Sequence, residues 1–264
     1  MKRDLAVVDT QLIKEKLLSK MHQPFVAKYV NSPQIDEDKI AFLYFLLHHH
    51  VKESEIAEAY LYATMFVQAA LDTHEFVSEG EMLSDEMRKN RQLTVLSGIY
   101  YSSFYYVILA QAGEITATKW LANAIEEINE QKMKLYHQDF KTIEQIIESI
   151  KMAETNLLLA FTKQFNSEKE AMLAKEFFFV KRYLKEEKML LNNQFSLLFH
   201  SLLPVFFTKR ELKKRIDEVV KQKQNEQMIQ TMRKYISTSI QKILNVTFSN
   251  GFNQYISKQI QKWS

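Results

Sequence analysis

The sequence has no cysteine, and it holds only four glycines and three prolines in 264 residues. Disulfides, thiolate zinc sites and cysteine nucleophiles are therefore excluded. Turns depend on glycine and proline, so their scarcity predicts few turns and a chain that is nearly all helix. The absence of cysteine suits a reducing compartment, and the N-terminus MKRDLAVVDT lacks an apolar signal core. We therefore expect a cytoplasmic protein.

Several other signatures are missing. No run of about 18 uncharged apolar residues is evident, so no membrane span is expected. Glycine-rich phosphate loops, serine-nucleophile motifs and known nucleic-acid-binding modules are absent, so no nucleic-acid partner is expected. The run His48-His49-His50 is a weak metal candidate, because consecutive helix positions point about 100° apart and cannot converge on one ion.

Hydrophobic residues make up 46% of the sequence, which is enough for a substantial core. Apolar spacing predicts helices at about 10–21, 36–50, 54–74, 91–111 and 115–136, with a polar loop at 77–90. Capping boxes open further helices, and they pair Thr142 with Gln145, Ser167 with Glu170 and Thr208 with Glu211.

The C-terminal third is expected to stay helical. One helix should end at Pro204, the helix opened at Thr208 should be long, basic and broken near Asn225, and a short helix should follow Gly251. We therefore predict an all-α fold, with a single helical domain at 1–207 and a basic helical extension at 208–264.

Charge is unevenly distributed. The segment from Thr208 to the end has 12 Lys and Arg against 4 Asp and Glu, a net of +8, whereas residues 1–207 have 23 against 28, a net of −5. A basic segment of this kind can meet nucleic acid, an anionic membrane surface or an acidic partner. A solvated helix face is the more ordinary explanation.

The stretch at 67–106 resembles the centre of trans-polyprenyl diphosphate synthases, which are all-helical enzymes. They carry a segment like HDDxxD on one helix and LAGD at the start of the next. Carboxylates at i and i+4 share a helix face and hold magnesium ions on the allylic diphosphate. Here His74-Glu75-Phe76-Val77-Ser78-Glu79 stands in place of the first segment, and Leu96-Ser97-Gly98-Ile99 in place of the second.

The chemistry of that motif is lost. Phe76 occupies a ligand position and cannot bind a cation, and Ile99 replaces the aspartate, so only Glu75 and Glu79 remain as relic carboxylates. Lys151-Met152-Ala153 resembles a worn Lys-Thr-Ala motif. The second aspartate-rich motif is missing, because Asp217 is the only aspartate after Asp139. We expect no cofactor or metal on this chain.

One subfamily is closer still. The strings Gln68 to His74, Asn90 to Gly98 and Ile128-Asn129-Glu130-Gln131-Lys132 resemble component I of the heterodimeric bacterial heptaprenyl or hexaprenyl diphosphate synthases. That resemblance implies a regulatory, non-catalytic subunit. Its partner would be a catalytic component II with Mg²⁺, which extends farnesyl diphosphate with isopentenyl diphosphate for the menaquinone side chain. Two alternatives stay open, an active prenyltransferase or terpene synthase using Glu75 and Glu79, and a basic helical adaptor.

The segment at 91–111 is predicted to be the partner surface and to influence product length. Its apolar residues surround the whole helix, and a helix that is apolar all round must be buried all round. Tyrosine favours interfaces, and small residues allow close helix approach. The predicted interface residues are Leu93, Leu96, Ser97, Gly98, Tyr100, Tyr101, Phe104, Tyr105 and Ile108.

Overall fold

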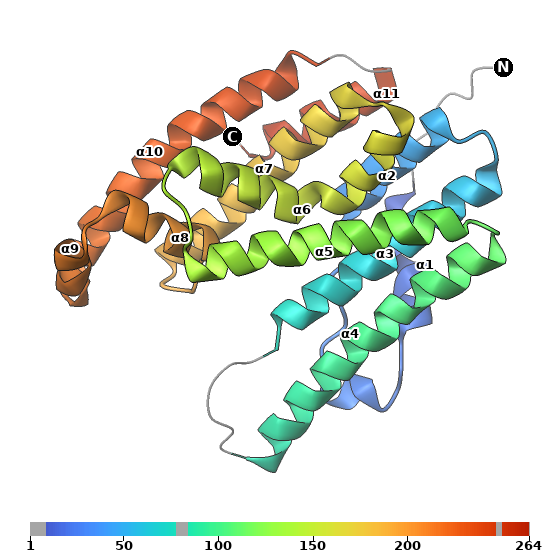
Figure 1. Cartoon of the computed structure of the whole chain (residues 1–264), viewed down its shortest axis with the longest axis horizontal. Coiled ribbons are helices and arrows are strands. Elements are labelled where there is room, and N and C mark those ends of the chain that lie inside the picture. The colour runs from blue at the N-terminus through green and yellow to red at the C-terminus, as the bar shows by residue number, and fades with distance from the viewer. Residues whose placement is uncertain (1–8, 78–83, 247–249, 264) are drawn as a thin grey trace. The chain divides into compact units, whose positions relative to one another are not determined.

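The computed structural model describes residues 9–77, 84–246 and 250–263. Every element in these ranges is helical, which confirms the all-α class (Figure 1). The chain divides into two compact units, Met1–Ala122 (unit 1) and Asn123–Ser264 (unit 2). The boundary predicted at 207/208 falls inside unit 2.

Unit 1 is built from α1 to α4 and the start of α5. Its elements are α1 (Thr10–Met21), the 3-10 turn η1 (Val26–Lys28), α2 (Glu37–His50), α3 (Ser54–Glu75) and α4 (Asp85–Gln111). Aspartates at the N-termini of α1 and α2 accept hydrogen bonds from backbone N–H groups that the helix leaves unpaired. The longest pairing in this unit is α3 against α4, which lie side by side in Figure 1.

The helix α4 begins six residues earlier than the sequence suggested. Ser84 caps it by accepting a hydrogen bond from the Met87 N–H at 3.1 Å, and Arg88 pairs with Asp85 within the first turn. Residues 85–90 are therefore helical, and the polar loop expected over 77–90 is wrong there. The helix ends before Gly113, whose φ of +75° suits glycine.

Unit 2 contains the rest of α5 (Ile115–His137) and the remaining helices. These are α6 (Ile143–Phe165), α7 (Glu168–Leu191), α8 (Leu197–Phe206), α9 (Lys209–Lys213), η2 (Lys214–Ile216), α10 (Glu218–Leu244) and α11 (Asn250–Gln261). Figure 1 shows α6 beside α7 and α10 alongside α7. The core is aromatic, and its fully buried rings include Phe161, Phe177, Phe178, Phe179 and Tyr183.

The predicted capping boxes have mixed outcomes. Thr208 and Glu211 form a complete box at α9. Thr142 caps α6, because its hydroxyl accepts a hydrogen bond from the Gln145 N–H. The Gln145 side chain, however, accepts from the N–H of Lys141 and not from that of Thr142, so the box is incomplete. Ser167 makes no side-chain capping bond at α7, so that box is wrong.

Two breaks lie elsewhere than predicted. The basic segment breaks at Asp217, which caps α10 by accepting from Val219 and Val220, and not near Asn225. The helix α8 continues through Pro204 to Phe206. Proline removes the hydrogen bond to the carbonyl four residues earlier, at His200. The Gln138 side chain donates to that carbonyl at 2.7 Å, which satisfies it.

Candidate partner interface and relic metal site

The relic motif lies where α3 ends. Glu75 is the last residue of α3, and Phe76 is its C-cap and is 63% exposed. The expected helical i, i+4 pairing needs a helix that continues to residue 79, and α3 stops before that. Glu79 lies outside the described residues. Among the described residues the motif therefore offers one exposed carboxylate, on Glu75, at a helix end.

Gly98 marks a close approach between α3 and α4. A Cβ atom at Gly98 would stand 2.5 Å from two ring atoms of His74, which is well inside contact distance. The ring of His74, the first residue of the relic motif, can take this position only against glycine. The small residues of the predicted interface thus serve contact with the chain's own α3, at least at Gly98.

The predicted interface residues separate into two groups on α4. The inward group, Ser97, Gly98, Tyr101 and Tyr105, is buried within the chain. Burial raises the pKa of Tyr101 and of Tyr105, and a hydrogen bond with Tyr106 raises the latter further. Their phenols therefore stay protonated at neutral pH. A charged substitution at these positions would test the chain's own fold.

Leu93, Phe104 and Ile108 lie at the border between the faces and are half-buried. Phe104 is held by two aromatic contacts. Its ring centroid is 4.8 Å from that of Phe66 on α3, and 5.0 Å from that of Tyr100 in an edge-to-face arrangement. Phe104 thus joins the inward packing to the outward side of α4.

The outward group forms one apolar stripe, which we call the α4 stripe. Its five large members are 42% to 57% exposed and are related by spacings of 3, 4 and 7 residues, which places them on one helix face. They are Leu96, Ile99, Tyr100, Tyr106 and Val107. Two of them, Leu96 and Tyr100, belong to the predicted set; Ile99, Tyr106 and Val107 were missed because apolar residues all round the helix hide which face is inward.

The small residues beside the stripe have their hydroxyls satisfied. Ser102 donates to the Ile99 carbonyl at 2.9 Å, and Ser103 donates to the Tyr100 carbonyl at 2.7 Å. No charged residue lies between Arg91 and Glu114. The stripe therefore presents apolar surface with two tyrosine hydroxyls, the composition found at the centre of protein interfaces.

The same composition makes α4 the one helix of the described residues that is long and apolar enough to cross a membrane. The sequence expectation of no such run overlooked the uncharged segment that follows Arg91. Of the most apolar window of α4, 33% is buried inside the structure.

The worn Lys-Thr-Ala motif has become part of the unit 2 core. Lys151 of α6 is buried and donates to Glu176 of α7 at 2.8 Å. Glu176 also accepts from Ser239 at 2.6 Å and Lys242 at 3.2 Å, both on α10. Burial acts to raise the pKa of Glu176, but the hydrogen bonds from Lys151 and Ser239 outweigh it and the pKa is lowered. Lys151 thus neutralises an internal carboxylate.

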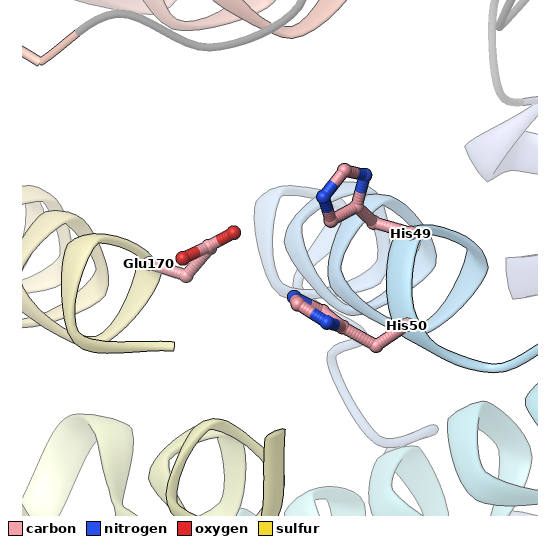
Figure 2. A group of neighbouring side chains, drawn as sticks. All are labelled: His49, His50 and Glu170. Atoms are coloured by element: carbon pink, nitrogen blue, oxygen red, sulfur yellow. The ribbon is translucent and has the colours of Figure 1, made fainter. Parts of the chain in front are cut away.

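The histidine run ends α2. His48 stacks on Tyr44, with ring centroids 3.8 Å apart, and its Nδ1 lies 3.0 Å from the Tyr44 carbonyl. His49 and His50 meet edge to face, with centroids 4.7 Å apart (Figure 2). The ring of His48 thus packs against Tyr44, whereas those of His49 and His50 pack against each other. Figure 2 also draws Glu170, which belongs to α7 of unit 2.

The chain is similar to several known proteins. Residues 23–237 match the family model described as heptaprenyl diphosphate synthase subunit 1. Heptaprenyl diphosphate synthase component 1 of Geobacillus stearothermophilus is 29% identical over 180 residues, which is 68% of this chain and 77% of that protein. A crystal structure of heptaprenyl diphosphate synthase from Staphylococcus aureus superposes with a TM-score of 0.46 and 17% identity, covering 86% of this chain and 98% of that one.

Proposed function

Because the chain belongs to the heptaprenyl diphosphate synthase subunit 1 family, we propose that it is the non-catalytic subunit of a heterodimeric prenyltransferase. A catalytic component II holds the Mg²⁺ ions and both aspartate-rich motifs. The pair extends farnesyl diphosphate with isopentenyl diphosphate to seven prenyl units, or to six, for the side chain of menaquinone. Assembly takes place in the cytoplasm.

The α4 stripe is the observation that carries this proposal. Its five large side chains lie along about 16 Å of helix, from Leu96 to Val107. A stripe of this kind serves as the buried centre of a subunit contact, with a polar rim around it. Component II is its occupant, because a component 1 chain implies a second component.

The condition of the relic site supports a non-catalytic role. Ionising an allylic diphosphate needs carboxylates that hold magnesium against the leaving group. Here Phe76 stands at one ligand position, and Ile99 at another, where it belongs to the exposed α4 stripe. The motif lysine, Lys151, is buried in an ion pair with Glu176.

The stripe also offers a means of regulating product length. An apolar product growing in the catalytic partner would pass along Leu96, Tyr100 and Tyr106 if these side chains cover one wall of its cavity. Truncating a tyrosine then opens space, as a large-to-small substitution does in any packed interior. We therefore expect Tyr100→Ala and Tyr106→Ala to lengthen the product while assembly persists.

The direct experiment combines co-purification with product analysis. The chain alone, given farnesyl and isopentenyl diphosphates and Mg²⁺, should form no polyprenyl product, and adding component II should restore synthesis. Robust turnover by the chain alone would sink the proposal. So would failure of the two components to co-purify.

A double substitution separates this proposal from an active enzyme that uses the relic carboxylates. Glu75→Gln with Glu79→Gln should leave most activity in the reconstituted pair. If the carboxylates serve catalysis, activity should fall about a thousandfold with assembly intact, the scale expected for loss of one transition-state contact.

A further inference from the structure

Unit 2 contains a pocket with basic lining residues, separate from the α4 stripe. It lies where the end of α7, the start of α8, η2 and the first turn of α10 come together, and these elements gather at one end of unit 2 (Figure 1). Its volume is about 150 Å³, space for several water molecules or one small anion.

Its polar lining is basic and neutral. Arg215, Lys221 and His200 line it together with Asn193, Gln194 and Ser196, and no acidic residue lines it among those that the structure describes. Burial lowers the pKa of His200, so this ring is neutral near pH 7 and offers a hydrogen bond. Arg215 and Lys221 therefore supply the positive charge.

Arg215 is oriented by neutral groups. Its Nη1 donates to the Gln224 side-chain oxygen at 3.1 Å, and its Nη2 donates to that of Asn225 at 2.6 Å. A partly buried guanidinium normally pairs with a carboxylate, because desolvation without a counter-charge is costly. The two amides fix the plane of the Arg215 guanidinium, and the nearby carboxylate of Glu218 offsets part of its charge.

Lys221 adds a second cation nearby. Its Nζ lies 3.3 Å from Glu218, a carboxylate that is exposed to solvent. A contact of that kind contributes little and is readily exchanged for a better-buried anion. The pocket thus presents two positive groups with incomplete compensation, which is the arrangement that binds phosphate oxygens.

The rest of the lining is apolar. Leu190, Phe199 and Leu203 form the floor, and the exposed Phe195 also lines the pocket, with its ring centroid 5.4 Å from that of His200. A ligand that carries a phosphate group on an apolar body matches both parts of this surface.

We propose that this pocket binds a phosphate-bearing anion through Arg215 and Lys221, and that its apolar floor accepts an attached hydrocarbon. The site belongs to unit 2 alone. It does not depend on the α4 stripe or on the presence of component II.

Calorimetry with inorganic diphosphate at low ionic strength tests the full-length chain. We expect saturable binding that weakens as salt rises. Arg215→Gln and Lys221→Gln should each weaken binding at least tenfold. Lys223→Gln is the matched control, since Lys223 is exposed on the same helix and does not line the pocket, and it should leave the affinity unchanged.

A second measurement removes the ambiguity of a variant that folds poorly. Diphosphate should raise the melting temperature of the wild-type chain and of Lys223→Gln, but not of Lys221→Gln, which keeps the Arg215 contacts. No binding by the wild-type chain, or equal binding by Lys221→Gln and Lys223→Gln, would overturn the proposal.

Farnesyl diphosphate distinguishes the two sources of the anion. Tighter binding than inorganic diphosphate, reversed by Leu203→Asn, identifies an isoprenoid phosphate that uses the apolar floor. Equal affinity for the two probes identifies the free anion as the ligand, and the attached hydrocarbon is then removed from the proposal.

Discussion

The helices α4 and α10 are both 27 residues long, and each buries one face against a neighbouring helix. They differ in the face that is left. The outward face of α10 carries polar and charged side chains such as Lys223, Glu226 and Lys234. The outward face of α4 is the apolar stripe that includes Leu96 and Tyr106.

The inward faces differ as well. On α4 the inward contacts are aromatic rings and the glycine that accommodates His74. On α10 the apolar residues Met228, Met232 and Ile236 are joined by a buried ionic cluster centred on Glu176. Water completes the solvation of α10, whereas α4 needs another apolar surface to complete its burial. The composition of the outward face, and not the length of the helix, therefore decides whether that face is stable in water or needs a binding partner.

The strongest way to break the comparison is to charge the inward face of α4. Tyr105 is 2% exposed, so Tyr105→Asp places a carboxylate in the unit 1 core. We expect destabilisation of about 4 kcal/mol, because a buried unpaired charge is among the costliest substitutions. Urea unfolding followed by circular dichroism measures it, and a stability within about 1 kcal/mol of wild type would show that α4 is not packed as described.

The second test concerns the inward face of α10. Glu176→Gln leaves Lys151 buried without its counter-charge and should cost about 3 kcal/mol. The pKa of Glu176 is lowered from 4.5 in the folded chain, so its contribution is present above pH 4.5 and is lost as the pH falls through the lowered folded value.

The difference in unfolding free energy between wild type and Glu176→Gln should therefore shrink as the pH falls below 4.5. Glu148→Gln is a suitable control, because the Glu148–Lys175 pair is largely exposed and should contribute little at any pH. A constant difference across this pH range would contradict the assigned role of Glu176.

The third test places a charge on the outward face of α4, at the residue next to Tyr105. Tyr106 is 55% exposed, so Tyr106→Asp should leave stability within about 0.5 kcal/mol. It should weaken binding to component II by about 2 kcal/mol, or roughly thirtyfold, since a charge enters the interface centre. Titration calorimetry of the two components measures it, and unchanged affinity in a folded variant removes the stripe from the interface.

The smallest expected effect is on the outward face of α10. Lys234→Gln should change neither stability nor component II binding, because Lys234 is exposed. If the +8 tail draws the complex to anionic membrane, each basic residue contributes about 1 kcal/mol, so vesicle binding at low salt should fall about fivefold. If the wild type and Lys234→Gln sediment equally with anionic vesicles, the charge of Lys234 serves solvation alone.

The sequence predicted the helices well where the apolar spacing was regular. That spacing located α1, α2 and α3 within a residue or two. The start of α4 was missed because residues 85–90 have no apolar spacing, and the helix there depends on the Ser84 cap and on a local ion pair. The break was predicted near Asn225 instead of at Asp217 because the polar run around Asn225 was taken as the interruption, although an aspartate before Val219 is a capping signal.

The interface prediction shows a different limit. Sequence spacing indicated that α4 is apolar all round, but such a pattern does not show which side of the helix packs against the chain's own core. Only the position of α3 assigns Tyr101 and Tyr105 inward and Ile99, Tyr106 and Val107 outward. The pocket at Arg215 had no sequence signal, because its lining comes from four elements whose meeting depends on the tertiary fold.

The uncovered α4 stripe has a consequence for how the chain must be produced. A free subunit with an exposed apolar helix face sticks to copies of itself and is a substrate for chaperones and proteases. We therefore expect yield and solubility to depend on synthesis in step with component II, with surplus chain degraded. Supply of one component then limits the abundance of the other, and expression of the pair from one transcript is the arrangement that wastes least protein.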